Sequence, residues 1–372
     1  YPNYEEMKKY TGVLAPWNFE VFRERLEKAG MLEQADDFFK ASGAWSVELY
    51  RADIEMNLRS KRMAGFQLLD LQDYPGQGSA YVGILDAFMD SKGLVEPKKW
   101  REFCSEVVPL LTTAKFCWTG GESFAGTVEI ANYGETSLNE KSISWELKNG
   151  KKSLGKGKMA IPSGLGLLTA GTIRLTLPDV EQAYKAELFL KVSGTSYQNS
   201  YPLWIYPTKK QLKAGNVVVA RQLTDDVLNA LKQGGKVLLM PREEDCKEDR
   251  IKKPASPGTL GILTNPEHPV FDDFPTEYHT NWQWYPIIKH SYPLILDGMP
   301  KEYRPIVQVI DNVERNHKLG LLMELNVEGG KLLLCMSDLE AVRDTPEGLQ
   351  FYAALLAYMN SSDFKPSTSL SV

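Results

Sequence analysis

The sequence has little cysteine and little histidine, with 4 residues of each in 372. Cys104, Cys117, Cys246 and Cys335 are scattered, without a C-x-x-C pair and without histidine at ligand spacing. This distribution excludes the disulfide framework of a small secreted domain and the usual cysteine-rich zinc site. We interpret the cysteines as small buried hydrophobes, and we predict no metal site and no cofactor.

The sequence also lacks long apolar runs and a basic excess. No run approaches the about 20 apolar residues that a membrane-spanning helix needs. The net charge of -5 argues against a sequence-independent nucleic-acid binder, and no basic amphipathic stretch points to a membrane surface. The beginning, Tyr1-Pro2-Asn3-Tyr4, has neither the basic nor the apolar region of a signal peptide and no initiator methionine, so we expect the natural chain to start upstream.

Three compositional blocks follow one another, and 372 residues are too many for one ordinary core. In residues 1–110, apolar residues recur at helical spacing over 19–29 and over 31–62. Gly65–Leu71 (GFQLLDL) then has the composition of a short buried strand, and a final helix is predicted over Pro97–Val107. This order is typical of the end of a larger α/β unit, because one strand cannot form a sheet.

The second and third blocks have different periodicities. In residues 111–207, alternating runs such as Thr127–Tyr133 and Ser142–Leu147, with a turn at Asn149-Gly150, predict a β-sandwich. In residues 208–372, strand Asn216–Ala220, a helix capped by Thr224 and strand Lys236–Met240 form a βαβ unit, which predicts parallel strands. Strands over 305–310, 320–326 and 331–335 and a helix over 346–359 complete the third block.

Several segments resemble one known family. Gly65–Gly78 (GFQLLDLQDYPGQG) and Gly83–Gly93 (GILDAFMDSKG) resemble the last strand and loop of the (β/α)8 barrel in β-galactosidase-like, family 2 glycoside hydrolases. Tyr201–Pro207 (YPLWIYP), with runs in the second block, resembles the immunoglobulin-like domain after that barrel. Phe274–Trp284 (FPTEYHTNWQW) resembles a C-terminal module related to flavodoxin- or amidotransferase-like folds. The resemblance covers essentially the whole chain.

The resemblance implies a multidomain α/β plus all-β protein and places the family's two catalytic glutamates upstream of Tyr1. A full barrel needs about 250 residues, so at most its remnant is present in residues 1–110. We therefore expect the C-terminal part of an exported, periplasmic or extracellular, retaining β-glycosidase that acts on carbohydrate, with no catalytic residue and no activity of its own. The alternatives are a non-catalytic carbohydrate-binding or oligomerisation module, including a homo-oligomer, and a front block that rebuilds a barrel with a second polypeptide.

The candidate substrate-binding residues follow the expected barrel strand. They are polar side chains at the end of a strand where a barrel builds its active site, namely Asp70, Gln72, Asp73 and Gln77. In the parent enzyme these groups would contact sugar hydroxyls. Two other interpretations stay open: the groups satisfy the loop backbone, or Asp70 and Asp73 form a catalytic pair about 5 Å apart.

Other residues have weaker functional patterns. Glu5, Glu6, Glu48 and Glu55 lie on helical patterns and are expected on solvated faces or as i,i+4 partners. The third block contains no G-x-S-x-G, and the carboxylates beside Cys246 raise the pKa of its thiol, so we expect no nucleophile there. We interpret one aromatic cluster as buried packing in the core or at a domain interface, with carbohydrate binding as the alternative. Its members are Tyr278, Trp282, Trp284, Tyr285 and Tyr292, and Asn281 and Gln283 flank them.

Overall fold

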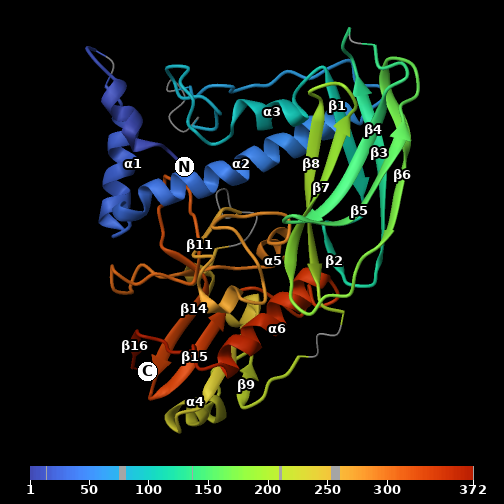
Figure 1. The fold of residues 1–372 in the computed structure, drawn as a ribbon. Helices are drawn as coiled ribbons and strands as arrows, with labels where there is room; N and C mark the ends of the chain where they lie inside the picture. Colours follow the sequence, from blue (N-terminus) through green and yellow to red (C-terminus); the bar gives the residue numbers. More distant parts are fainter. Residues whose placement is uncertain (14, 75–80, 136, 209–211, 253–259, 372) are drawn as a thin grey trace. The chain divides into compact units, whose positions relative to one another are not determined.

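The computed structural model describes residues 1–13, 15–74, 81–135, 137–208, 212–252 and 260–371 (Figure 1). The chain divides into two compact units. Unit 1 comprises residues 1–45, 70–92 and 210–372, and unit 2 comprises residues 46–69 and 93–209. The protein is therefore mixed α/β with several sheets. Within the described ranges, no helix is long and apolar enough to cross a membrane.

Unit 1 contains a mixed sheet of 8 strands whose main path runs β11-β13-β14-β15-β10-β9. Strand β9 pairs in parallel with β10, and β10 pairs in parallel with β15, whereas β15, β14, β13 and β11 are joined by antiparallel pairing. The predicted parallel portion of the third block is thus confirmed. The strands are β9 (Val217–Ala220), β10 (Lys236–Leu239), β11 (Ile262–Thr264), β12 (Leu294–Ile295), β13 (Val307–Val309), β14 (Leu319–Val327), β15 (Gly330–Cys335) and β16 (Ser369–Leu370).

Two capped helices accompany this sheet. Helix α4 (Asp225–Lys232) begins after Thr224, whose side chain accepts a hydrogen bond from the Val227 backbone N–H. Its buried residues Val227 and Leu231 join the core formed with β10, β14 and β15. Helix α6 (Pro346–Asn360) begins with Pro346 after the Thr345 cap and is buried along most of its length. A short helix, α5 (Tyr285–Lys289), precedes β12.

The beginning of the chain belongs to unit 1 as helices rather than strands. The elements are η1 (Tyr4–Lys9), α1 (Trp17–Lys28), η2 (Leu32–Gln34) and the first part of α2 (Ala35–Leu58). Leu26, Met31 and Phe38 pack with Ile310 in one core cluster. Phe19 and Phe22 pack with Tyr81 in another, so the N-terminal helices share their hydrophobic core with later parts of unit 1.

Unit 2 is a sandwich of two β-sheets with one shared core. The 3-stranded sheet has the order β1-β3-β6, and the 5-stranded sheet has the order β2-β8-β7-β4-β5. Buried residues from both sheets, such as Val128, Ile173, Leu147 and Leu188, form one cluster, which explains the alternation seen in the sequence. The strands are β1 (Val107–Thr113), β2 (Cys117–Thr119), β3 (Ser123–Asn132), β4 (Ser142–Asn149), β5 (Lys152–Ala160), β6 (Gly166–Thr176), β7 (Tyr184–Val192) and β8 (Gln198–Tyr206).

The strand predicted at Gly65–Leu71 is wrong. In the described part of the chain no strand forms before β1, and the segment leaves Phe66, Leu69 and Leu71 at 42%, 78% and 44% exposure. Asp70 has a φ of 60°, which interrupts an extended run, and no neighbouring strand offers ladder hydrogen bonds. The helix predicted to reach Val107 ends at Phe103 as α3 (Pro97–Phe103), because Val107 already begins β1.

Candidate functional site

Three of the four predicted substrate-binding residues, Asp70, Gln72 and Asp73, lie in unit 1 at the end of the Gly65–Leu71 segment and just after it. Asp70 is half-buried, and Gln72 is exposed, with its backbone bridged to Leu85. Asp73 is 2% exposed. Gln77 lies outside the described residues. The structure therefore brings Gln72 and Asp73 to one loop edge but leaves only Gln72 fully accessible.

Asp73 belongs to a buried ion pair. Its Oδ1 accepts hydrogen bonds from the Gly83 backbone N–H at 2.9 Å and from Lys92 Nζ at 2.6 Å, and Lys92 also donates to the Tyr81 carbonyl. Burial raises the pKa of Asp73, although Lys92 acts in the opposite direction. Gly83 is required here, because an added Cβ would lie 2.4 Å from the Gln72 carbonyl carbon. These contacts hold the loop together and occupy Asp73 Oδ1.

A second buried carboxyl group lies near Asp73. Glu6 is 2% exposed, and its Oε1 accepts long hydrogen bonds from Tyr10 Oη at 3.3 Å and from the Ala87 N–H at 3.4 Å. Its Oε2 is buried and has no hydrogen-bond partner among the described residues. Burial, followed by the charges of Asp73 and Asp86, raises the pKa of Glu6. The expectation that Glu6 lies on a solvated helix face is therefore wrong.

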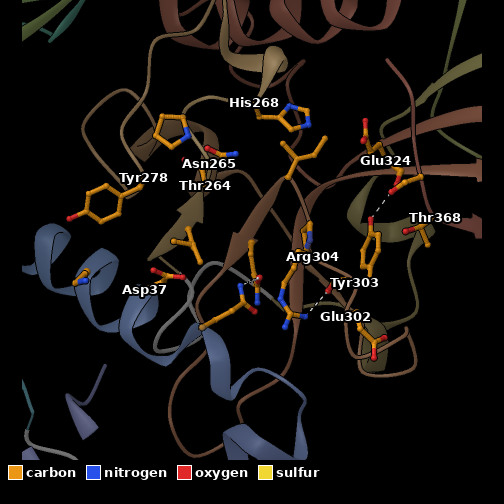
Figure 2. Close-up of a pocket in the computed structure, with 18 residues that line it drawn as sticks. Asp37, Thr264, Asn265, His268, Tyr278, Glu302, Tyr303, Arg304, Glu324 and Thr368 are labelled. Atoms are coloured by element: carbon orange, nitrogen blue, oxygen red, sulfur yellow. Dashed lines mark hydrogen bonds between the residues drawn. The ribbon is translucent and has the colours of Figure 1, made fainter. Parts of the chain in front are cut away.

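A cavity of about 790 Å³ lies elsewhere in unit 1 and is the stronger candidate site (Figure 2). Its wall is formed by the end of η2 and the start of α2, by β11 and the loop after it, and by Tyr278. The segment that leads into β13, one residue of β14 and the C-terminal segment complete it. The lining residues are Gln34, Asp37, Lys40, Leu263, Thr264, Asn265, Pro266, His268, Tyr278, Glu302, Tyr303, Arg304, Pro305, Ile306, Gln308, Glu324, Ser367 and Thr368.

One side of the cavity carries a hydrogen-bonded carboxylate. Glu324, on β14, accepts a hydrogen bond at Oε2 from Tyr358 Oη at 2.6 Å. The Glu324 carbonyl accepts from Tyr303 Oη at 3.4 Å, the contact drawn as a dashed line in Figure 2. Burial raises the pKa of Tyr358, with the Glu324 hydrogen bond as the next cause, so this phenol stays a donor at neutral pH. The carboxylate is therefore held in a fixed orientation.

His268 adds one directed donor. Its Nδ1 accepts a hydrogen bond from the Val270 N–H at 3.2 Å, so the neutral ring carries its proton on Nε2. Burial lowers the pKa of His268, although Glu324 and Asp272 act in the opposite direction. The ring packs edge-on against Tyr358 at 5.3 Å between centroids. At neutral pH, the His268 imidazole in the cavity wall is therefore uncharged.

Fixed amide and guanidinium groups complete the wall. Gln34 Nε2 donates to Gln308 Oε1 at 2.9 Å, and Gln308 Nε2 lies 3.2 Å from Met31 Sδ. The buried Gln34 Oε1 has no hydrogen-bond partner in the described ranges. The Arg304 guanidinium donates to the carbonyls of Lys301, Tyr303 and Gly30, which locks this cation in place.

The aromatic cluster predicted from the sequence is partly buried, with Trp284 and Tyr292 buried and Trp282 and Tyr285 half-buried. Trp284 is fully buried and donates from Nε1 to Thr276 Oγ1, and Tyr292 is 6% exposed. The flanking amides serve the backbone: Asn281 Oδ1 accepts from the N–H groups of Gln283 and Trp284. Tyr278, at 42% exposure, is the cluster member that lines the cavity (Figure 2). The preferred interpretation as buried packing therefore holds for Trp284 and Tyr292, while Tyr278 offers a ring face to a ligand.

Other sequence expectations concern metal binding and nucleophiles. Across the described residues, no group of three or more His, Cys, Asp or Glu side chains is placed to hold a metal ion. Burial, followed by the charges of Asp245 and Glu243, raises the pKa of Cys246. The prediction that neighbouring carboxylates raise the pKa of this thiol is therefore confirmed. Most cavity residues were missed by sequence reasoning, because they come from six separate segments and share no motif.

Two family models match separate parts of the chain. Residues 122–207 match a domain of unknown function, DUF8488, and residues 218–372 match a second domain of unknown function, DUF8487. No curated protein matches the chain. The two matched segments correspond to most of the sandwich in unit 2 and to the β9-to-β16 portion of unit 1.

Several solved structures are similar to parts of the chain, and they include glycosidases. The Listeria innocua β-glucosidase in complex with glucose has a TM-score of 0.20 and 19% identity, covering 27% of this chain and 16% of that protein. The Parabacteroides merdae β-glucuronidase has a TM-score of 0.20 and 14% identity, and the match covers 37% of this chain and 22% of that protein. AvmM, which catalyses macrocyclization in alchivemycin A biosynthesis, has a TM-score of 0.23 and 10% identity, and the match covers 30% of this chain and 94% of that protein. At these scores, the similarities carry no conclusion about activity.

Proposed function

We propose that this chain is a carbohydrate-binding, non-catalytic C-terminal part of a family 2-type retaining β-glycosidase, and that the unit 1 cavity is its sugar site. The observation that carries the proposal is the composition of the cavity wall. One aromatic ring, Tyr278, lies across the cavity from the hydrogen-bonded Glu324, with polar groups between them (Figure 2).

This wall suits a neutral sugar. Each hydroxyl group of a sugar both donates and accepts, so it needs acceptors and donors side by side. Asp37, Glu302 and Glu324 supply carboxylate acceptors, and His268 Nε2 supplies a donor. The C–H face of the sugar would stack on the Tyr278 ring, and its hydroxyl groups would pair with these carboxylates and with His268 Nε2.

The absence of catalysis is supported by the contacts of Asp73. A retaining glycosidase needs two carboxyl groups about 5 Å apart and free to reach the sugar. Asp73 is buried, and its Oδ1 is taken by Gly83 and Lys92, so we assign it to loop stability in this chain. Contacts of Asp70, Gln72, Asp73 and Gln77 with sugar stay a proposal for the parent enzyme.

The finer fold assignments belong to the same proposal. The sheet orders β1-β3-β6 and β2-β8-β7-β4-β5 support an immunoglobulin-like sandwich over residues 111–207. The parallel strands β9, β10 and β15 support a flavodoxin- or amidotransferase-like domain over residues 208–372, with an added antiparallel part. Residues 1–110 would complete the end of a barrel in the parent, which we place in the periplasm or outside the cell.

A binding titration with a panel of neutral mono- and oligosaccharides tests the sugar site. Tyr278→Ala should weaken binding about tenfold, because it removes the stacking surface, and Glu324→Gln should weaken it by a similar factor. Tyr133→Ala is the matched control, since Tyr133 is a 54% exposed tyrosine of unit 2. No saturable binding to any sugar, or equal losses in the control, would contradict the assignment.

A further inference from the structure

The β4–β5 hairpin of unit 2 concentrates positive charge. The stretch of residues 148–158 contains five lysines and no acidic residue. Strand β5 is the edge strand of the 5-stranded sheet, so the lysines of β5 lie at one border of that sheet. The lysines are Lys148, Lys151, Lys152, Lys156 and Lys158.

The strand register places several of these side chains on the outward face of the sheet. Ile143 and Leu147 of β4 point into the sandwich core, so Ser144, Glu146 and Lys148 point outward. Ser144 pairs with Lys158 on one side and with Lys191 on the other, which forms one cross-strand row. Glu146 pairs with Lys156 and with Phe189, which forms a second row beside it.

The positive charge on this face exceeds the negative charge, which comes from Glu146 and from Glu187, the residue of β7 that pairs with Lys148. Glu146 lies 3.1 Å from Lys148, which neutralises its charge. Lys151, Lys152, Lys158 and Lys191 are exposed, and in the described ranges none lies within ion-pair distance of a carboxylate. We name Lys148, Lys156, Lys158 and Lys191 on this outward face, with Lys151 and Lys152 at the turn, the lysine face.

We propose that the lysine face binds an acidic polysaccharide that carries carboxylate or sulfate groups. Neighbouring strands are about 4.8 Å apart and alternate residues about 6.7 Å apart, so the ammonium groups form a regular grid. A polymer with a charge on each repeat can contact several points of such a grid, whereas one sugar cannot.

The choice of a glycan over a nucleic acid rests on the proposed carbohydrate function and on two further observations. Single-stranded nucleic acids bind through free aromatic platforms, but Lys148 Nζ already lies over the Phe189 ring at 5.8 Å. The net charge of the chain is -5, whereas nucleic-acid binders carry a basic excess. Lysines on an edge strand also block pairing with a second sheet, and loss of that role would produce aggregation rather than weaker glycan binding.

Affinity electrophoresis tests the proposal with four probes: polygalacturonate, heparin, neutral galactan and a double-stranded DNA oligonucleotide. Polygalacturonate or heparin should retard the protein, and retardation should decline steeply as salt rises, because exposed charges are screened within about 10 Å at 0.1 M. Lys156→Gln with Lys158→Gln should weaken binding about tenfold. The control is Lys61→Gln with Lys98→Gln, which removes equal charge from two other exposed lysines of unit 2.

The outcomes separate this proposal from the sugar site. Tyr278→Ala should leave retention by acidic polymers unchanged, so the experiment distinguishes failure of the lysine face from failure of the sugar site. Equal retention by galactan, tighter binding to DNA, or equal losses in the two double variants would overturn the lysine face as a glycan surface. Sedimentation of each variant should show the same distribution of species as the wild-type chain at the same concentration, which excludes aggregation as the cause of any loss.

Discussion

At the scale of single residues, the main difference from the sequence-based expectations lies in buried charge. Glu55 was expected as a solvated residue or an i,i+4 partner, and it is such a partner of Arg51 and Arg59. It is also 4% exposed and accepts hydrogen bonds from Asn199 and Tyr201. Helical spacing predicts the local ion pair. The burial of Glu55 cannot be predicted from the sequence around it, because the residues that bury it lie more than a hundred positions away.

Removing Glu55 should therefore destabilise unit 2. Glu55→Ala leaves the buried Arg51 guanidinium without its carboxylate, which costs about 3–5 kcal/mol in the free energy of unfolding. Glu181→Ala, at an exposed position of the same unit, should change it by less than about 0.5 kcal/mol. Urea unfolding of both variants measures the difference, and similar values would contradict the importance of the buried network.

Glu6 gives a pH-dependent prediction. Its pKa is raised in the folded state, so its contribution to stability is present below its unfolded pKa and is lost as pH rises through the folded pKa. Glu6→Gln imitates the protonated acid and should stabilise unit 1 at pH 8 with little effect near pH 4. Urea unfolding at both pH values checks this, and a destabilised variant at pH 8 would show that the ionised form is required.

At the scale of elements, hydrophobic periodicity predicted most strands and helices. The alternating runs at Thr127–Tyr133 and Ser142–Leu147 lie almost entirely in β3 and β4, because one face of each strand packs into the sandwich core. The same kind of reasoning failed at Gly65–Leu71, because an apolar run specifies a strand only when a neighbouring strand completes its hydrogen bonds. Composition alone contains no information on that partner.

Helix α6 offers a direct test of close packing. A Cβ added to Gly348 would lie 2.1 Å from the Val342 carbonyl oxygen, so Gly348→Ala should destabilise unit 1 by about 1–3 kcal/mol. Gly298→Ala is the control in the same unit, because a Cβ there meets nothing within 4 Å. Thermal unfolding compares the two, and equal melting temperatures would argue against the tight turn before α6.

At the scale of the whole molecule, the candidate cavity was the least predictable feature. Its walls combine residues near position 37, near 265, at 278, near 304, at 324 and near 368, which only the folded unit 1 brings together. Tyr278 alone was singled out from the sequence, because aromatic residues next to amides are typical of sugar sites. The loop residues Asp70, Gln72, Asp73 and Gln77 stay a prediction about the parent enzyme.

The exposed extended segment should make the chain self-associate. Leu69 is 78% exposed beside Phe66 and Leu71, which is unusual for a run of large apolar side chains. Leu69→Asp should reduce concentration-dependent association in sedimentation velocity experiments, whereas Leu165→Asp, at a 75% exposed position of unit 2, should not. A wild-type chain that stays monomeric at all concentrations would remove this segment as an association surface.

The decisive experiment is calorimetric titration of this chain with a glycoside that the panel shows to bind. A ligand that binds without reaction gives heat pulses that return to the baseline and saturate, whereas a hydrolysed substrate gives continuous heat. We expect saturation without turnover, and loss of the signal in Tyr278→Ala. Continuous heat that disappears in Asp70→Asn or Asp73→Asn would instead place a catalytic pair in the loop and contradict a non-catalytic sugar site.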